Sequence, residues 1–310
     1  MLFKRSTAVG ATLVTVLAFT ATTASARSIV DSWPTETVYG LGPNGDYVSE
    51  WMGASAGWTN IGGPAEDLVG GSAGLFEIDE TSGDILEYDG TPGSWTDIGG
   101  PGGEFVESQG HLYGLGPDGK YVAEWNGTPH SWTIIGGAAQ NIYGGGDGLI
   151  ATSPGETYTG SVWYYNGTPE SWTDIGGTGY SFVVGPHGIY RLNYDAKSIS
   201  QWGGGTTWVS IGTPSGDPVN FDTVGDEGLV IIDGQTGDNL RYNDTPGSFT
   251  EIGNMYSGTP GPDVESISSI YGVKYLDDTL TTVGVYVYSG SGTNWTLIGA
   301  PFSPVIAAEE

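Results

Sequence analysis

The sequence predicts an all-β protein: a seven-bladed β-propeller of four-stranded antiparallel blades, with its ring closed by the C-terminal strand. Three observations lead to this fold class. A W-T-x-I-G motif or a close variant recurs seven times, 36 to 46 residues apart. Each copy divides into short apolar runs separated by the turn residues Gly, Pro, Asn and Asp. No stretch beyond residue 27 carries a helical period of useful length. Four strands in a repeat of about 40 residues are typical of a propeller blade.

The repeat holds aromatic residues in a fixed register. Those within the motif are Trp58, Trp95, Trp132, Trp172, Trp208, Phe249 and Trp295. A second aromatic residue precedes each of them by seven positions, or by six in the fifth copy: Trp51, Tyr88, Trp125, Tyr165, Trp202, Tyr242 and Tyr288. Twelve positions earlier a third one stands in four copies, at Tyr39, Phe76, Tyr113 and Tyr190. We expect most of these rings to pack between blades, because every blade must bury the same face.

The third copy illustrates the expected strands and turns of one blade. Its expected strands are GEFVES (103–108), HLYGL (111–115), YVAEW (121–125) and SWTIIG (131–136). The segments PDG and NGTP separate the last three, and Asn-Gly supplies the positive φ that a tight hairpin needs. The Gly-Gly after each Ile is expected to let the chain turn inward where the blades crowd.

Ring closure is predicted from the two ends of the repeat region. The tail Ser303–Ala308 stands where the first strand of a following blade would stand, whereas the first copy, opening at Thr37–Leu41, lacks such a strand. The tail is therefore expected to complete the first blade. The segment SIVDS (28–32) is the competing candidate. The propeller is expected over 37–308, after a lead-in at 27–36.

The first 26 residues have the form of a signal peptide. Lys4 and Arg5 precede an apolar stretch, 8–20, that is too short to span a bilayer, and Ala24-Ser25-Ala26 matches a cleavage site. The protein is therefore expected to be secreted, extracellular and monomeric.

The composition excludes several classes of partner. Beyond residue 26, 36 acidic residues face six basic ones, a net charge of −30. Such a chain repels phosphate backbones and anionic lipid, so neither nucleic acid nor a membrane surface is an expected partner. The chain has no cysteine, so its stability must come from the core rather than from disulfides.

The repeat resembles that of the tectonin and tachylectin-type β-propellers over roughly 37–308. The segment SWTDIGGPGGEFVESQGHLYGLGPDGKYVAEW (94–125) carries the likeness. It implies either a lectin that binds N-acetylated sugars in clefts between blades or a protein-interaction platform. Family members with five and six blades are known, whereas this chain has seven copies. It is also similar to exported seven-bladed propellers of actinobacteria of the dispase autolysis-inducing type, which act on a secreted metalloprotease.

Three patterns imitate catalytic motifs. Gly40–Gly45 and Gly114–Gly119 satisfy G-x-G-x-x-G, but a strand follows each where a dinucleotide site needs a helix. Gly70–Gly74 satisfies G-x-S-x-G, but again a strand follows. The histidines, His111, His130 and His187, fall in three copies at different positions and offer no triad partner. We therefore expect no enzyme activity and no catalytic residue.

Acidic loops leave a calcium site open as an alternative to no cofactor at all. Asp79, Glu80 and Asp84 lie in one such loop, Asp233 and Asp238 in another, and Asp277 and Asp278 in a third. Exported proteins can bind calcium through such oxygens. None of the loops has the spacing of a calcium-binding loop, and the competing interpretation is a solvated hairpin in which Asp supports its own turn.

The expected function is binding, most simply lectin-like recognition of neutral or N-acetylated glycans. Aromatic faces stack on pyranose rings, and Asn or Asp follows several of the aromatic residues. The candidate ligand-binding residues are Trp51, Trp58, Tyr88, Trp95, Trp125, Trp132, Tyr165, Trp172, Trp202, Trp208 and Trp295. The competing interpretation of each ring is packing between blades. The alternative function is a platform for a secreted protein such as a metalloprotease.

Overall fold

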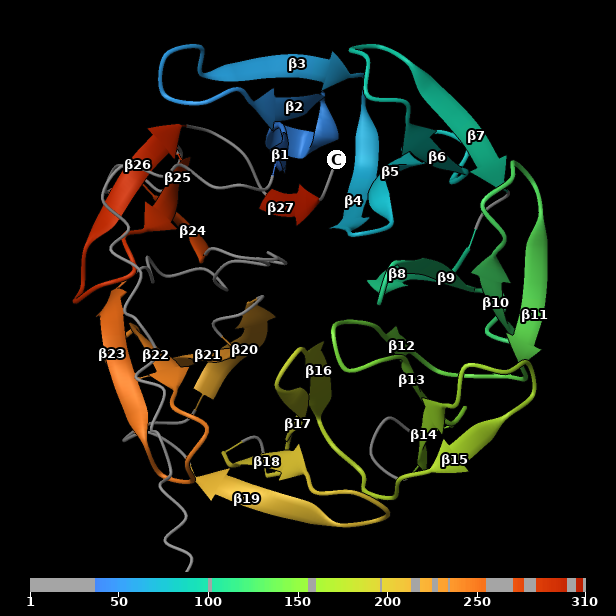
Figure 1. Cartoon of the computed structure of the whole chain (residues 1–310), viewed down its shortest axis with the longest axis vertical. Coiled ribbons are helices and arrows are strands. Elements are labelled where there is room, and N and C mark those ends of the chain that lie inside the picture. Colours follow the sequence, from blue (N-terminus) through green and yellow to red (C-terminus); the bar gives the residue numbers. More distant parts are fainter. Residues whose placement is uncertain are drawn as a thin grey trace, which may run out of the picture. The chain divides into compact units, whose positions relative to one another are not determined.

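Seven small antiparallel sheets follow one another along the chain and form a ring (Figure 1). The computed structural model describes residues 37–99, 102–155, 160–195, 197–212, 218–224, 228–233, 235–254, 270–275, 283–299 and 305–308. These residues belong to one unit, Ser32–Glu310. The expected signal peptide and the lead-in at 27–36 lie outside the described residues. The predicted fold class, a seven-bladed all-β propeller, is confirmed.

Each sheet is one blade. Its strands are hydrogen-bonded in chain order from the inside of the ring outward, except that in blade 1 the C-terminal strand is the innermost. Blade 1 consists of β27 (Val305–Ala308), β1 (Thr37–Leu41), β2 (Val48–Trp51) and β3 (Trp58–Gly62). Blade 2 consists of β4 (Ala65–Gly71), β5 (Gly74–Asp79), β6 (Ile85–Tyr88) and β7 (Trp95–Gly99). Blade 3 consists of β8 (Glu104–Ser108), β9 (His111–Leu115), β10 (Val122–Trp125) and β11 (Trp132–Gly136), close to the four predicted runs.

The second half of the ring repeats this plan. Blade 4 consists of β12 (Ile142–Tyr143), β13 (Ile150–Thr152), β14 (Val162–Tyr165) and β15 (Trp172–Asp174). Blade 5 consists of β16 (Ser181–Gly185), β17 (Gly188–Leu192), β18 (Ile199–Trp202) and β19 (Trp208–Gly212). Blade 6 consists of β20 (Pro218–Val224), β21 (Gly228–Asp233), β22 (Asp238–Tyr242) and β23 (Phe249–Asn254). The described strands of blade 7 are β24 (Tyr271–Tyr275), β25 (Val283–Tyr288) and β26 (Trp295–Gly299), and a short 3-10 turn, η1 (Pro43–Gly45), follows β1.

The C-terminal strand closes the ring as predicted. β27 pairs antiparallel with β1, and Thr37, Val38, Tyr39 and Gly40 face Ala308, Ala307, Ile306 and Val305 in turn. In Figure 1 the red β27 lies beside the blue β1. The two ends of the repeat region therefore share one sheet, and separating them breaks backbone pairing. The competing segment, residues 28–32, lies outside the described residues.

The core is divided among the contacts between neighbouring blades, which we call seams. Seven clusters of buried apolar side chains are present, one at each seam. At seam 1/2, for example, Tyr39 and Leu41 of blade 1 pack with Leu68 and Leu75 of blade 2. Each blade contributes a face to two clusters, so every copy of the repeat needs apolar residues at the same positions.

A β-bulge explains the Ile of the W-T-x-I-G motif. In blade 3, Val122 pairs with Gly136 while Ala123 pairs with Ile134, so that Ile135 is the extra residue. The same shift leaves Ile61, Ile98, Ile211, Ile252 and Ile298 unpaired in their blades. A bulge removes one residue from the ladder and turns its backbone groups aside. The Ile carbonyl is thereby free to accept a hydrogen bond from the next blade.

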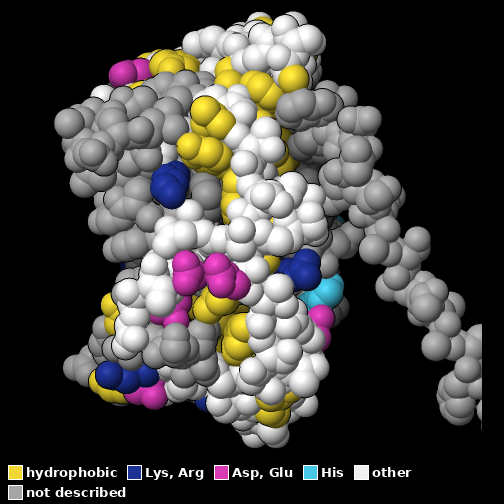
Figure 2. Space-filling model, turned by 90° about the vertical axis from the view of Figure 1, so that its left-hand side faces the viewer, with side chains coloured by type: hydrophobic (Ala, Val, Ile, Leu, Met, Phe, Trp, Pro, Cys, Tyr) yellow, Lys and Arg dark blue, Asp and Glu magenta, His cyan; other side chains and the backbone are white. Residues whose placement is uncertain are grey.

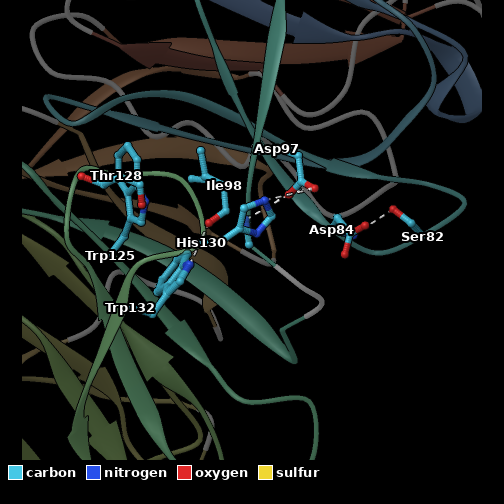
Figure 3. A network of polar contacts seen from close by, with 9 residues as sticks. Ser82, Asp84, Asp97, Ile98, Trp125, Thr128, His130 and Trp132 are labelled. Atoms are coloured by element: carbon cyan, nitrogen blue, oxygen red, sulfur yellow. Dashed lines mark hydrogen bonds and ion pairs between the residues drawn. The ribbon is translucent and has the colours of Figure 1, made fainter.

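The tryptophan of the motif supplies that hydrogen bond. The indole Nε1 of Trp132 donates to the Ile98 carbonyl at 2.9 Å, across seam 2/3 (Figure 3). Nε1 donors at five other seams repeat the contact: Trp58 to Ile298, Trp95 to Ile61, Trp172 to Ile135, Trp208 to Ile175 and Trp295 to Ile252. At several seams the glycine after the Ile makes room for the ring; a Cβ at Gly99, for example, would lie 2.6 Å from Nε1 of Trp132. The expected packing role of these rings is therefore seen directly.

Candidate functional site

The two ends of the ring differ in what their connections do. Antiparallel pairing places every turn between third and fourth strands at one end, which we call the hairpin face: residues 52–57, 89–94, 126–131, 166–171, 203–207, 243–248 and 289–294. The connections between second and third strands, and those between blades, lie at the opposite end, the loop face. Sites on the hairpin face recur with the repeat, whereas loop-face sites belong to individual blades.

Side-chain hydrogen bonds link the two ends of each of several repeated hairpins; we call such a set, an Asn or Asp bonded to a Ser and a Thr, a clasp. In blade 3 the amide nitrogen of Asn126 donates to Ser131 Oγ at 3.0 Å, and its oxygen accepts from Thr133 Oγ1 at 2.9 Å. Asn166 and Asn243 make the same pair of contacts, and Asp89 accepts from Ser94 and Thr96. The polar groups expected beside a sugar are thus already engaged within the protein. This explains why the dozen residues of the hairpin recur as a unit.

The eleven predicted binding residues lie along the seams rather than at one site. Six of them are the indole donors described above. Within a blade, rings pair at centroid distances of 4.9 Å for Tyr88 with Trp95, 5.0 Å for Tyr165 with Trp172 and 5.5 Å for Trp51 with Trp58. The indoles of Trp125 and Trp202 donate to carbonyls of their own hairpins. All eleven except the buried Tyr165 keep a partly exposed edge, and ligand contact by those edges stays a prediction.

A cleft on the loop face brings together a different set of residues. It measures about 360 Å³, counted with the solvent space at its mouth, and lies where blade 4 meets the entry to blade 5. Its lining is Gln140, Asn141, Tyr143, Thr152, Ser153, Gly160, Val162, Thr178, Gly179, Tyr180 and Phe182. No charged side chain is among them, although the chain carries 36 acidic residues. Among the residues that the structure describes, the cleft is therefore lined by hydroxyl, amide, aromatic and apolar groups.

The backbone fixes the blade 4 wall of this cleft. Gln140 donates its backbone N–H to the Thr152 carbonyl at 2.8 Å, and the Asn141 N–H donates to Thr152 Oγ1 at 3.1 Å. Ser153 Oγ accepts from the indole of Trp163 at 3.0 Å. The Asn141 backbone and the Ser153 hydroxyl are thus held in place at the wall of the cleft.

The blade 5 wall carries the aromatic surface. Tyr180 is 51% exposed, and its backbone N–H donates to the Leu192 carbonyl at 2.8 Å. Behind it, the Phe182 ring lies 5.5 Å from that of Tyr143. Arg191 stacks over Trp208 at 4.5 Å and donates to the Thr178 carbonyl at 3.1 Å, which ties the loop to blade 5. An exposed phenol on a rigid loop is suited to stacking against a flat apolar face.

Two pKa shifts describe the electrostatics near the cleft. Burial, together with the Glu104 carboxyl, raises the pKa of Tyr143 to about 12, so this phenol stays neutral. Burial likewise raises the pKa of Glu104 to about 7, although its Oε2 accepts the Ile142 N–H at 2.9 Å. The Glu104 carboxyl, which contacts the strand that carries Tyr143, therefore holds its proton to a higher pH than an exposed glutamate does.

The motifs that imitate catalytic sequences have structural roles. Ser72 of the G-x-S-x-G match lies in the turn between β4 and β5, a strand-to-strand turn, and donates to Glu107 at 3.2 Å. The histidines form three separate pairs with carboxylates: His111 with Glu124 at 2.9 Å, His130 with Asp97 at 3.7 Å and His187 with Asp244 at 3.2 Å. No nucleophilic hydroxyl completes any of these pairs among their contacts in the described part of the chain.

The acidic loops use their carboxylates in their own turns. Asp79 Oδ1 accepts the backbone N–H groups of Thr81 at 3.0 Å and Ser82 at 2.7 Å, and these bonds lower the pKa of Asp79. Asp233 Oδ1 accepts those of Gln235 and Thr236 in the same way. Residues 277–278 lie outside the described residues. Within the described ranges, no group of three or more His, Asp or Glu side chains is arranged to hold a metal ion. A calcium requirement stays a prediction.

One side of the ring shows no separation of charged from apolar side chains among the residues described. On the side of the ring drawn in Figure 2, acidic and basic side chains lie scattered among apolar and uncharged ones. In the part of the chain that the structure describes, no helix is long and apolar enough to cross a membrane.

Comparisons with known proteins identify the fold but no family. No protein-family model and no curated protein matches the chain. Among solved structures, apo AztD from Citrobacter koseri is similar with a TM-score of 0.57 and 13% identity, over 88% of this chain and 97% of that one. A streptogramin B lyase structure is similar with a TM-score of 0.52 and 11% identity, over 84% and 87%. At this identity the likeness shows the propeller fold alone, and the fold is shared by binding proteins and enzymes.

Proposed function

We propose that the protein is an exported, non-enzymatic binding propeller whose cleft between blades 4 and 5 takes a neutral or N-acetylated glycan. The observation that carries the proposal is the lining of the cleft. In a chain with 36 acidic residues, the described part of this lining holds an exposed tyrosine beside amide and hydroxyl groups and no charged side chain.

The chemistry of the lining favours a sugar over other small ligands. A pyranose has an apolar face that stacks on an aromatic ring, and its edge of hydroxyls needs donors and acceptors in the same plane. Tyr180 supplies the ring, and Asn141, Gln140 and Ser153 lie on the facing side. An acetamido group adds one donor and one acceptor, which a side-chain amide matches. The resemblance of the repeat to the tectonin-type lectins supports the same ligand class.

The eleven aromatic residues along the seams form a second set of proposed contacts. Their exposed edges repeat around the hairpin face, so weak contacts there would add up only for a ligand that is itself repetitive. The cleft needs no such repetition, because its groups converge within one seam. A single sugar per chain therefore indicates the cleft, and several sugars per chain indicate the hairpins.

A pull-down tests the proposed function. The purified chain is incubated with chitin, with peptidoglycan and with proteins of a culture supernatant, with and without calcium. Retention on chitin or peptidoglycan, released by free N-acetylglucosamine, is the expected result. Retention only by a secreted protein would instead support the interaction platform, for example toward a metalloprotease. Dependence on calcium would restore the acidic loops as a cofactor site.

The residue test uses two tyrosines of the same face. Tyr180→Ala removes the exposed ring of the cleft and is expected to weaken binding at least about tenfold, or roughly 1.4 kcal/mol. Tyr194→Ala is the matched control, because Tyr194 is 61% exposed on the next loop and does not line the cleft. Equal loss in both variants would move the site away from the cleft.

A further inference from the structure

Seam 5/6 lacks a contact that the other six seams share. Six indole Nε1 atoms donate to the bulged or terminal Ile carbonyl of the preceding blade at 2.6 to 3.1 Å. In blade 6 the motif begins with Phe249, which has no donor, so the Ile211 carbonyl receives no indole. This difference is set by one residue of the sequence.

The phenyl ring of Phe249 also fills less of its seam than an indole does. A Cβ added at Gly62, Gly99, Gly136 or Gly253 would lie 2.6 to 3.1 Å from the tryptophan of the next blade. A Cβ at the equivalent Gly212 would meet only the backbone of Gly247, at 3.6 Å, and no ring within 4 Å. Phe249 packs against the apolar cluster of seam 5/6, but its ring does not reach Gly212 as the indoles reach the glycines of those four seams.

The contacts that remain at seam 5/6 do not replace the indole. The Gly247 N–H donates to the Ile211 carbonyl at 2.8 Å, and the rings of Tyr190 and Tyr242 meet at 6.2 Å. The amide contact recurs at seams 1/2, 2/3 and 3/4, for example from His130 to Ile98, and those three seams have the indole as well. The ring contact also has counterparts, such as Tyr39 with Tyr88. His187 and Asp244 also bridge the seam, but at exposed positions, where an ion pair adds little.

We propose that seam 5/6 opens more readily than seams 1/2, 2/3 and 3/4, and that Phe249 sets this difference. The opening is a local event in which blade 6 separates from blade 5 while β27 stays paired with β1. It would expose Ile211, Leu229 and Ile231, which are buried in the cluster of that seam. This inference does not depend on the glycan proposal.

Four amides provide a matched set for the test. The N–H groups of Gly93, His130, Glu170 and Gly247 donate to Ile61, Ile98, Ile135 and Ile211, each at 2.8 Å. The first three acceptors also receive an indole, and the fourth does not. Native-state hydrogen exchange reports the free energy of local opening at each amide. After correction for intrinsic rates, the protection of Gly247 is expected to be at least about fivefold lower, the effect of one hydrogen bond.

Two substitutions decide whether Phe249 is the cause. Phe249→Trp supplies the missing donor and is expected to raise the protection of Gly247 to that of the other three amides. Trp132→Phe copies the defect into seam 2/3 and is expected to lower the protection of His130 about fivefold. Should Phe249→Trp fail to fold, Trp132→Phe alone gives the answer. Equal protection of the four amides in the wild-type chain, or earlier exchange of the β1 amides that pair with β27, would overturn the inference.

Discussion

The hairpin face of this propeller repeats the same residues from blade to blade, whereas the loop face does not. On the hairpin face, the same aromatic pair and the same Asn–Ser–Thr clasp recur from blade to blade, and their polar groups bind to one another. On the loop face, Tyr143, Tyr180 and Phe182 meet at one place only, and the polar groups around them face a cleft. Repetition in this chain therefore marks architecture, and departure from the repeat marks the candidate site.

Among substitutions of the repeated residues, Trp132→Ala is expected to lower the stability of the protein most. The substitution removes the indole from seam 2/3 together with its hydrogen bond to Ile98, so the free energy of unfolding is expected to fall by about 3 kcal/mol. Denaturant unfolding measures the loss. The control is Ile134→Ala, two residues further along β11, whose side chain is 56% exposed and whose loss is expected to cost little. A similar loss in both variants would contradict the packing role of the tryptophan.

Removing the closing strand is expected to have an effect of similar size. Deletion of 302–310 takes away β27 and its four paired positions on β1, at a cost of roughly 2–4 kcal/mol. Thermal melting measures it, and deletion of 309–310 alone keeps β27 whole. An unchanged melting temperature after the longer deletion would show that the ring closes in another way.

A buried carboxyl gives a pH-dependent prediction. Glu77 is 5% exposed, and burial, with a smaller contribution from Asp79, raises its pKa to about 7. This pKa lies above that of a glutamate in the unfolded chain, so the folded state binds the Glu77 proton more tightly. The stability that this proton contributes to the folded state is fully present below about pH 4.3 and is lost as the pH rises to about 7. Glu77→Gln is thus expected to stabilise the protein by up to about 3 kcal/mol at pH 8 and hardly at all at pH 4.

The control for this prediction is Glu66→Gln, which changes an exposed carboxylate on the neighbouring strand. Unfolding of the three proteins is compared at both pH values. A gain of equal size at pH 4 and pH 8 would mean that the substitution acts through packing rather than through ionisation.

The smallest effect on stability is expected from opening one clasp. Asn126→Ala removes the contacts to Ser131 and Thr133, but both hydroxyls can turn to water, so the loss is about 1 kcal/mol or less. Asn60→Ala, at an exposed position on β3, serves as the control and is expected to be neutral. Glycan binding is expected to survive in both variants. Loss of binding in Asn126→Ala alone would return the hairpins to the candidate site.

The sequence predicts nearly all of the architecture because the architecture repeats. Seven copies in one register reveal strands, blades and even the closing role of residues 303–308, since a missing first strand at one end matches a spare one at the other. The bulge at each Ile could not be predicted, because it is visible only in how Val122 and Ala123 pair across the sheet.

The cleft escaped prediction for the same physical reason. Phe182 has an equivalent in Phe105 of blade 3 and so reads as part of the repeat. Tyr180 lies in a loop between blades, where a single tyrosine carries no periodic signal. One indication was present, and it is shared with the sixth and seventh copies, which are longer still at 41 and 46 residues: the fourth copy spans 40 residues, and its Ile150 stands fifteen rather than twelve positions before Tyr165. That insertion widens the connection from β13 to β14, which forms one wall of the cleft. In a repeat protein, the copy that departs in length is a good place to look for a site.

The most direct test of the division between the two faces is a titration of the isotopically labelled chain with an N-acetylglucosamine oligomer, followed by amide chemical shifts. The account predicts saturable shifts at residues 140–143, 152–153 and 178–182, with the hairpins at 89–96 and 126–133 unmoved. Shifts that gather instead at the hairpin aromatics, with the cleft unmoved, would contradict it and make the repeated tryptophans the binding residues.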